Sequence, residues 1–183
     1  PGNEISVLSL RVMPLPGDDQ SSRYHIVSGI DISERKRAEA QVWHQANYDH
    51  LTNLPNRALL LERTRQAIKQ QERSGRSVAL LFIDLDEFKS VNDNFGHEAG
   101  DLMLRDLSAR LRDNLRGNTS TEVGKAATAA EVEVVARIGG DEFLICLPGV
   151  KNPDDAAQVI GRLFDAIRSP ITIGQEQLVI GGS

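Results

Sequence analysis

The chain has 183 residues, of which 40% are hydrophobic and 26% are charged, and its formal net charge at pH 7 is -5. A chain of this length can bury one sizeable core and leaves room for a second small unit. Its acidic balance lacks the basic footprint that binds a nucleic-acid backbone, so an anionic substrate would need metal ions. No apolar stretch approaches the roughly 20 residues of a membrane span, and no signal-peptide pattern opens the chain. We therefore expect a cytoplasmic segment that contacts neither nucleic acid nor membrane, in a protein that could be membrane-anchored elsewhere.

The first residues predict a β-hairpin followed by a helix. Two β-rich runs, 5–12 and 24–30, flank a turn-rich segment. Two strands alone are marginal in water, and the chain opens on Pro1 rather than Met, so we expect a fragment whose sheet continues upstream. Asp31 followed by Glu34 resembles a capping box, and 34–45 is helical by composition.

The remaining segments alternate between helical and strand patterns. The expected elements are a helix over 56–73 that stops at Gly75, a buried strand over 78–83, an amphipathic helix from about Glu98, a surface loop over 117–130, strands over 133–138 and 141–147, a helix over 154–168, and short strands over 171–173 and 178–180. This order predicts an α+β fold, an α/β sandwich with helices packed on a sheet. The single cysteine, Cys146, lies in an apolar run, which favours a small buried hydrophobe in a reducing compartment.

Two aspartates stand where the predicted buried strand ends. The strand period of two puts Asp84 and Asp86 on one side, while Leu85 points away. Paired carboxylates repel unless a cation lies between them, and hard oxygen ligands suit Mg²⁺. The alternative is that both aspartates face water or cap the next helix.

A second group of chemical residues lies at the predicted hairpin tip, Arg137 to Phe143. A two-residue turn at Gly139 and Gly140 would place Arg137 opposite Glu142, and Ile138 and Ala136 opposite Asp141 and Phe143. A cross-strand ion pair between Arg137 and Glu142 would then be a purely structural role. The glycines would equally let a phosphate approach the backbone, with the adjacent acids reaching a metal.

A third group lies between Phe88 and Asp101. Asn92 and Asp101 offer an amide and a carboxylate to a purine edge, and Lys89 offers a positive charge to phosphate. The plainer interpretations are that Asp101 favours a helix N-terminus and that His97 is a hydrogen-bonding loop residue.

Taken together and in this order, several motifs resemble the GGDEF family. They are Tyr48 to Arg57, Phe82 to Lys89, Asn92-Asp93, Gly96-His97, Gly100-Asp101, and Gly139 to Phe143. The resemblance spans residues 48–183 and implies a diguanylate cyclase with a palm-like sheet, which condenses two GTP into cyclic di-GMP and pyrophosphate as a homodimer of such domains.

The resemblance also implies roles for individual positions. Mg²⁺ or Mn²⁺ would be held by Asp84, the Leu85 carbonyl and Asp141, with Glu142 supporting metal binding or proton removal, so that Asp141 and Glu142 are the catalytic pair. The GTP site would comprise Phe88, Lys89, Asn92, His97, Asp101, Gly139 and Gly140, with Asn92 and Asp101 reading guanine.

The sequence departs from the family pattern in two places. The product-inhibition motif upstream of the signature would need Arg and Asp where Ala130 and Glu133 stand, so we expect that feedback site to be absent. Family members also continue beyond the position of Ser183 with another strand and helix, so we expect a domain truncated at its C-terminus. The runner-up function is a non-catalytic, GTP-binding regulatory domain of a larger GGDEF-EAL phosphodiesterase.

The segment Asp31 to Lys36 resembles the end of a PAS domain. The implied organisation is the C-terminal part of a PAS sensor over 1–32, a linker or signalling helix over 33–47, and the GGDEF domain over 48–183. An ordinary hairpin followed by a linker helix is the alternative.

Overall fold

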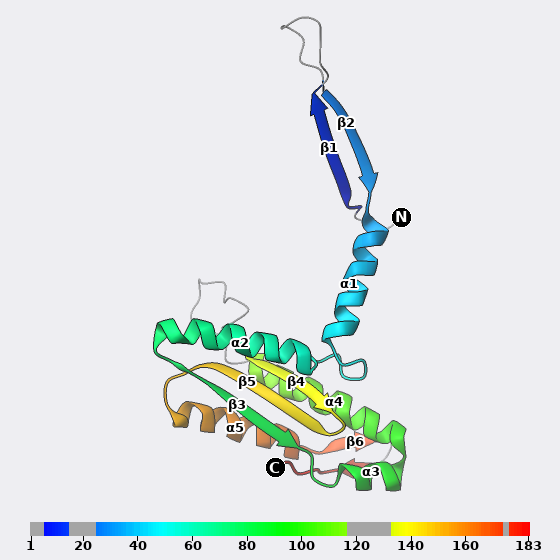
Figure 1. Ribbon diagram of the computed structural model, residues 1–183. Coiled ribbons are helices and arrows are strands. Elements are labelled where there is room, and N and C mark those ends of the chain that lie inside the picture. The colour runs from blue at the N-terminus through cyan, green and yellow to red at the C-terminus, as the bar shows by residue number, and fades with distance from the viewer. Residues whose placement is uncertain (1–5, 15–24, 117–132, 174–175) are drawn as a thin grey trace, which may run out of the picture. The chain divides into compact units, whose positions relative to one another are not determined.

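A computed structural model of the protein describes residues 6–14, 25–116, 133–173 and 176–183 (Figure 1). The chain divides into two compact units, residues 1–46 and residues 47–183. In the first unit, β1 (Leu8–Pro14) pairs antiparallel with β2 (His25–Asp31), and the helix α1 (Ser33–Asn47) follows. The predicted hairpin and helix are therefore present. None of the helices in the described part of the chain has the length and apolar character that crossing a membrane requires.

The second unit is a mixed helix and sheet domain, as the sequence predicts. Its elements in chain order are α2 (Arg57–Ser74), β3 (Ser77–Asp84), α3 (Phe88–Phe95), α4 (His97–Arg116), β4 (Val134–Gly139), β5 (Glu142–Val150), α5 (Pro153–Arg168), β6 (Ile171–Ile173) and β7 (Glu176–Leu178). Three strands form an antiparallel sheet in the order β3-β5-β4, and β6 pairs with β7. Figure 1 shows α2 on one face of the larger sheet and α5 on the other.

The helix ends follow from local chemistry. The Asn56 side chain accepts hydrogen bonds from the amides of Ala58 and Leu59, which satisfies two of the free donors at the start of α2. Gly75 ends the helix with φ of 67°, a left-handed conformation that glycine adopts without strain. The predicted stop is thus confirmed.

The core lies mainly between the sheet and the helices α4 and α5. Alternate residues of the strands point to this side, and they pack against the leucine-rich face of α4. The largest of these fully buried side chains are Phe143, Ile145, Met103, Leu104, Leu107, Leu111, Leu163 and Ile167. A smaller cluster under α2 joins Leu60 and Ala67 to Ala136 and Cys146.

Four expectations need correction. The strand β3 is not buried on both faces, since Leu80 and Phe82 are 54% and 56% exposed. The buried side chains of α2 on that face pack on Ala136 of β4 and Cys146 of β5 and leave these two residues of β3 uncovered. Residues 88–95 form a helix, α3, where no helix was expected, and β7 starts two residues earlier than predicted. His97 begins α4 rather than lying in a loop.

The expected loop over 117–130 and the position of Ala130 lie outside the described residues.

Arg110 of α4 holds the C-terminal end of α5. Its guanidinium donates to the carbonyl of Ser169 at 2.6 Å and to that of Pro170 at 2.8 Å, and its Nε lies 2.7 Å from a carboxylate oxygen of Asp106. Carbonyls at a helix end lack helical partners and carry partial negative charge, so a cation there is favourable.

We predict that Arg110→Ala lowers the free energy of unfolding by about 1–2 kcal/mol, because charge-assisted hydrogen bonds to those carbonyls are lost. Urea unfolding monitored by circular dichroism measures the change. Arg105→Ala, an exposed position on the same helix, is the matched control and should change stability by less than about 0.5 kcal/mol. Equal effects of the two substitutions would contradict the role of Arg110.

Candidate active site

The candidate site lies where β3 ends and the hairpin of β4 and β5 begins. The register pairs Asp84 with Glu142 across β3 and β5. Both backbone groups of Asp84 bond Ser183 on the other side, each at 3.0 Å, so Asp84 and Glu142 form a non-hydrogen-bonded pair. In such a pair the Cα atoms lie about 4.5 Å apart and the side chains share a face. The two carboxylates are therefore direct neighbours.

The Leu85 backbone points toward the same place. Asp84 and Asp86 direct their amides to Ser183 and Gly181, so the peptide groups of Leu85 between them point to the opposite side, where β5 begins. The Leu85 side chain is 3% exposed and lies in the core, which fixes this segment. The Leu85 carbonyl is thus directed toward the side of the hairpin.

The hairpin register differs from the expected one. Gly139, rather than Arg137, is opposite Glu142, and Arg137 is opposite Phe143, because the register shifts between Arg137 and Gly139. The turn residues are Gly140, with φ of 53°, and Asp141. Asp141 therefore lies in the turn, while Glu142 begins the strand and faces Asp84. A Cβ added to Gly139 or Gly140 would meet no atom within 4 Å, so the backbone at the tip is open to a ligand.

Arg137 makes a different ion pair from the one considered for Glu142. Its Nη1 donates to Asp49 at 3.0 Å and its Nε donates to the Gly140 carbonyl at 2.9 Å, and both side chains of the pair are largely buried, 12% and 17% exposed. The Arg137 amide also donates to the Pro55 carbonyl at 3.1 Å. These contacts fix the hairpin tip to the segment before α2. The sequence motif at 48–57 contained this carboxylate, but no pattern indicated its partner.

The entry into α3 presents free backbone donors. Glu87, the residue before the helix, adopts a left-handed conformation with φ of 59°, and its side chain makes no capping hydrogen bond. The first helical bond runs from the Val91 amide to the Glu87 carbonyl at 3.3 Å. Helix N-termini of this kind favour anions, and Lys89 in the first turn is exposed.

The packing of α3 on α4 places Asn92, one of the two predicted guanine-reading residues, against the residue that precedes the other. The side-chain oxygen of Asn92 lies against Gly100, where a Cβ would collide with it, and Gly100 directly precedes Asp101. Phe88 contacts the same glycine and packs against the core. His97 is exposed at the start of α4.

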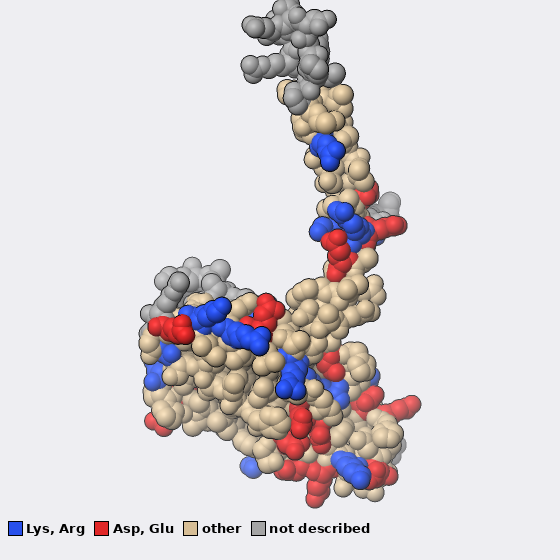
Figure 2. Space-filling view, viewed as in Figure 1, with Lys and Arg blue, Asp and Glu red and all other residues tan. Residues whose placement is uncertain are grey.

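The chemistry of these donors suits a hard divalent cation. Figure 2 shows acidic side chains gathered around the end of β3 and the start of α3. In the described ranges no three His, Cys, Asp or Glu side chains are grouped as a metal site. Two carboxylates with a backbone carbonyl nevertheless form an all-oxygen set, which fits Mg²⁺ or Mn²⁺ completed by substrate phosphates.

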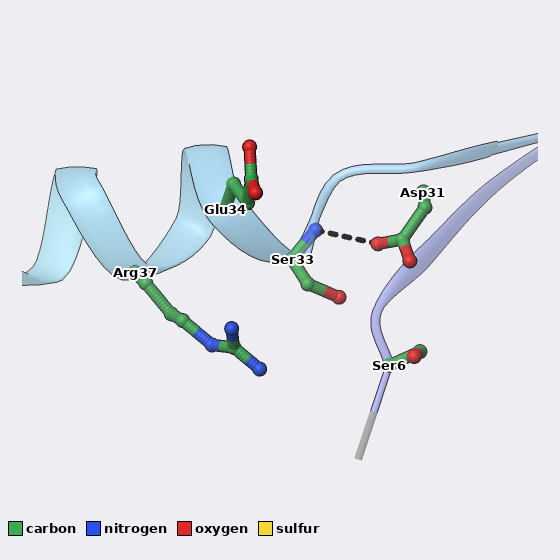
Figure 3. Close-up of a pocket in the computed structure, with 5 residues that line it drawn as sticks. All are labelled: Ser6, Asp31, Ser33, Glu34 and Arg37. Carbon is green, nitrogen blue, oxygen red and sulfur yellow. Dashed lines mark hydrogen bonds between the residues drawn. The ribbon is translucent and has the colours of Figure 1, made fainter. Parts of the chain in front are cut away.

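A separate pocket lies in the first unit, lined by Ser6, Asp31, Ser33, Glu34 and Arg37 (Figure 3). Its hydrogen bonds join strand to helix: the Ser33 amide donates to Asp31 at 2.8 Å, and the Ser33 hydroxyl accepts from the Val7 amide at 2.8 Å. The hydrogen bonds from Ser33 hold the pKa of Asp31 below its ordinary value. The pocket is thus a capped strand-to-helix junction.

Comparison with known proteins gives concordant matches. The family model described as "Diguanylate cyclase, GGDEF domain" matches residues 46–183. The bifunctional diguanylate cyclase/cyclic di-GMP phosphodiesterase MucR of Pseudomonas aeruginosa is 36% identical over 88% of this chain and 22% of its own length. Diguanylate cyclase TpbB of the same species is 35% identical over 76% of the chain and 29% of its own length. The chain thus spans about a quarter of these relatives.

The solved structures that resemble this protein include a sensory box/GGDEF family protein from Caulobacter crescentus. It is 35% identical, with a TM-score of 0.62, over 75% of this chain and 80% of that one.

The pair of Asp49 and Arg137 should make stability depend on acid pH. Burial alone would raise the pKa of the Asp49 carboxyl, but hydrogen bonds from Thr52 and Arg137 outweigh burial and hold the pKa below its ordinary value of 3.8. A carboxyl with a lowered folded-state pKa contributes stability above its unfolded-state pKa and loses it as pH falls through the folded-state pKa.

We predict that Asp49→Asn lowers the free energy of unfolding by about 2 kcal/mol at pH 7, because it leaves Arg137 without its counter-charge. The difference from the unchanged protein should stay constant down to about pH 5 and shrink below about pH 4. Urea unfolding at a series of pH values measures it. Asp113→Asn, at a side chain 66% exposed, is the control for loss of a carboxylate, and a difference that persists undiminished at pH 3 would refute the prediction.

Proposed function

This chain belongs to the GGDEF domain family of diguanylate cyclases, and on that basis we propose that it condenses two GTP molecules into one cyclic di-GMP and two pyrophosphates. The observation that carries the proposal is the pairing of Asp84 with Glu142 beside the Leu85 carbonyl. Like charges directly opposite one another destabilise a sheet. Their direct opposition at one strand end therefore favours a role in binding a cation.

Each part of the site has a place in this reaction. Asp84, the Leu85 carbonyl, Asp141 and Glu142 would hold Mg²⁺ or Mn²⁺. The chemistry supplied by a bound divalent ion is neutralisation of the triphosphate and a lower pKa of the attacking ribose 3'-hydroxyl. Glu142 supports metal binding or accepts the proton of that hydroxyl.

The nucleotide is held at two ends. The amides at the start of α3, with Lys89, bind phosphate oxygens, and the open backbone at Gly139 and Gly140 admits them closely. The Asp101 carboxylate accepts hydrogen bonds from the amino and imino groups of guanine, and the Asn92 amide can donate and accept at the same base edge. Phe88 packs against the core beside Gly100, and His97 lies at the start of the helix that carries Asp101.

Each domain holds one GTP, so the reaction needs two domains face to face, with each 3'-hydroxyl attacking the partner's α-phosphorus. We propose that such a homodimer forms in the full-length protein under control of a PAS sensor, whose last hairpin is β1 and β2. The alternative is a regulatory domain that binds GTP without turnover, as part of a GGDEF-EAL phosphodiesterase. The similarity to a bifunctional cyclase/phosphodiesterase supports this regulatory alternative. The presence of Asp84, Asp141 and Glu142 together supports synthesis.

We predict that Asp84→Asn in the full-length protein lowers cyclic di-GMP synthesis by roughly a hundredfold or more, because an amide is a poor ligand for Mg²⁺. The fold should be retained, since the substitution removes a repulsion on the surface. Initial rates from GTP and Mg²⁺, measured by separating the nucleotides, test this, and Asp93→Asn at an exposed site on α3 is the control. Unchanged synthesis would remove Asp84 from the site.

We also predict that GTP binds more tightly than ATP by about 2 kcal/mol, some thirtyfold, because adenine leaves Asn92 and Asp101 unpaired. Asn92→Ala should reduce this preference, whereas Asn94→Ala, an exposed position on α3, should leave it intact. Calorimetric titration with each nucleotide gives the ratio. Equal affinity of the unchanged protein for both nucleotides would contradict the assignment.

A further inference from the structure

The two aspartates that follow β3 differ in what their side chains contact. Asp84 is the cross-strand neighbour of Glu142 and bonds Ser183 through its backbone. The carboxylate of Asp86 is itself engaged: its Oδ1 accepts a hydrogen bond from the Ser183 hydroxyl at 3.2 Å. The Asp86 amide also donates to the Gly181 carbonyl at 3.1 Å. Only Asp84 therefore presents its carboxylate to Glu142.

Gly181 gives the Asp86 side chain the room it needs. A Cβ at this position would lie 2.6 Å from Oδ2 of Asp86 and 3.4 Å from its Cγ. At the next residue, Gly182, a Cβ would meet its nearest atoms at 3.5 Å, which is ordinary contact. The need for glycine at 181 thus comes from the Asp86 carboxylate.

These contacts tie the segment 181–183 to the Leu85 backbone from both ends. Leu85 and Ile180, 3% and 4% exposed, lie in the same core cluster. The backbone of Asp84 is hydrogen-bonded to Ser183, and the Asp86 amide is hydrogen-bonded to the Gly181 carbonyl. The Asp86 amide belongs to the same peptide plane as the Leu85 carbonyl, so these bonds fix the direction of that carbonyl. A shift of Asp86 would therefore turn that carbonyl.

We propose that Asp86 is a positioning residue, which acts through Ser183 and Gly181 to hold the Leu85 carbonyl as a metal ligand, and that it is not itself a ligand. This inference rests on the proposed function, since it assigns the metal to Asp84 and the Leu85 carbonyl. It requires the shape and hydrogen bonding of Asp86, not its charge. Asparagine should therefore be able to replace Asp86, whereas it should not be able to replace Asp84.

The test is a titration of the full-length protein with Mn²⁺ alone, in which free Mn²⁺ is measured by electron paramagnetic resonance. Asp86→Asn keeps an acceptor for the Ser183 hydroxyl and should bind Mn²⁺ within about threefold of the unchanged protein. Asp86→Ala should weaken binding about tenfold or more, the usual effect of losing a residue that orients a ligand. Asp84→Asn should weaken it at least as much.

A second pair of variants tests the same contact from the other side. Gly181→Ala should displace the Asp86 carboxylate and weaken Mn²⁺ binding about tenfold, whereas the matched Gly182→Ala should bind within about threefold of the unchanged protein. In an Asp86→Ala background, Gly181→Ala should add little, because the colliding carboxylate is gone.

Three results would overturn the inference: a loss in Asp86→Asn as large as in Asp84→Asn, an unaltered affinity in Asp86→Ala, or no Mn²⁺ binding by the unchanged protein. Failure of the proposed function gives a different result. In that case the Mn²⁺ affinities follow the expected order, but the unchanged protein makes no cyclic di-GMP from GTP.

Discussion

The antiparallel pairing of one residue, Asp84, with a neighbour on each of its sides is the constraint on which the rest of the site depends. On one side its backbone is bonded to Ser183, and on the other it is the close cross-strand neighbour of Glu142. Because hydrogen-bonding direction alternates along a strand, this arrangement also directs the Leu85 carbonyl to the hairpin side. One register thus brings two carboxylates and a carbonyl from distant parts of the sequence to one place.

Concentrating negative charge at a strand end has a cost that the surrounding structure offsets. The hairpin tip is held by Arg137, which donates hydrogen bonds to Asp49 and to the Gly140 carbonyl. The end of β3 is held by the core, in which the next residue, Leu85, is almost completely buried. This support holds the two acids in a fixed arrangement, and a metal or phosphate site needs such preorganisation.

Three glycines of the domain matter because they lack a Cβ: two leave room for a neighbouring side chain, and one allows a left-handed backbone. Gly100 admits the Asn92 side chain and Gly181 admits the Asp86 carboxylate, while Gly140 supplies the left-handed turn between β4 and β5. The same chemical feature, the absence of a Cβ, thus shapes the contact between α3 and α4, the segment beside Asp86 and the turn between β4 and β5. At Gly100 and Gly181 a larger residue would displace a polar side chain, whereas at Gly140 it would strain the backbone.

The sequence by itself determined the identity and order of the motifs, the mixed α+β class, and the elements with a clear period or cap, such as α2 between Asn56 and Gly75. It did not determine α3, because eight residues rich in Asn and Asp carry weak helical propensity, and packing of Phe88 and Val91 against the core stabilises the helix instead. The turn predicted at Gly139 and Gly140 was also wrong by one residue. A register shift between Arg137 and Gly139 places the turn at Gly140 and Asp141, so that Arg137 lies opposite Phe143 and Glu142 lies opposite Gly139. Which carboxylate faces Asp84 and which cation pairs with Asp49 were therefore decided only by tertiary structure, since contacts across strands depend on register and not on any local pattern.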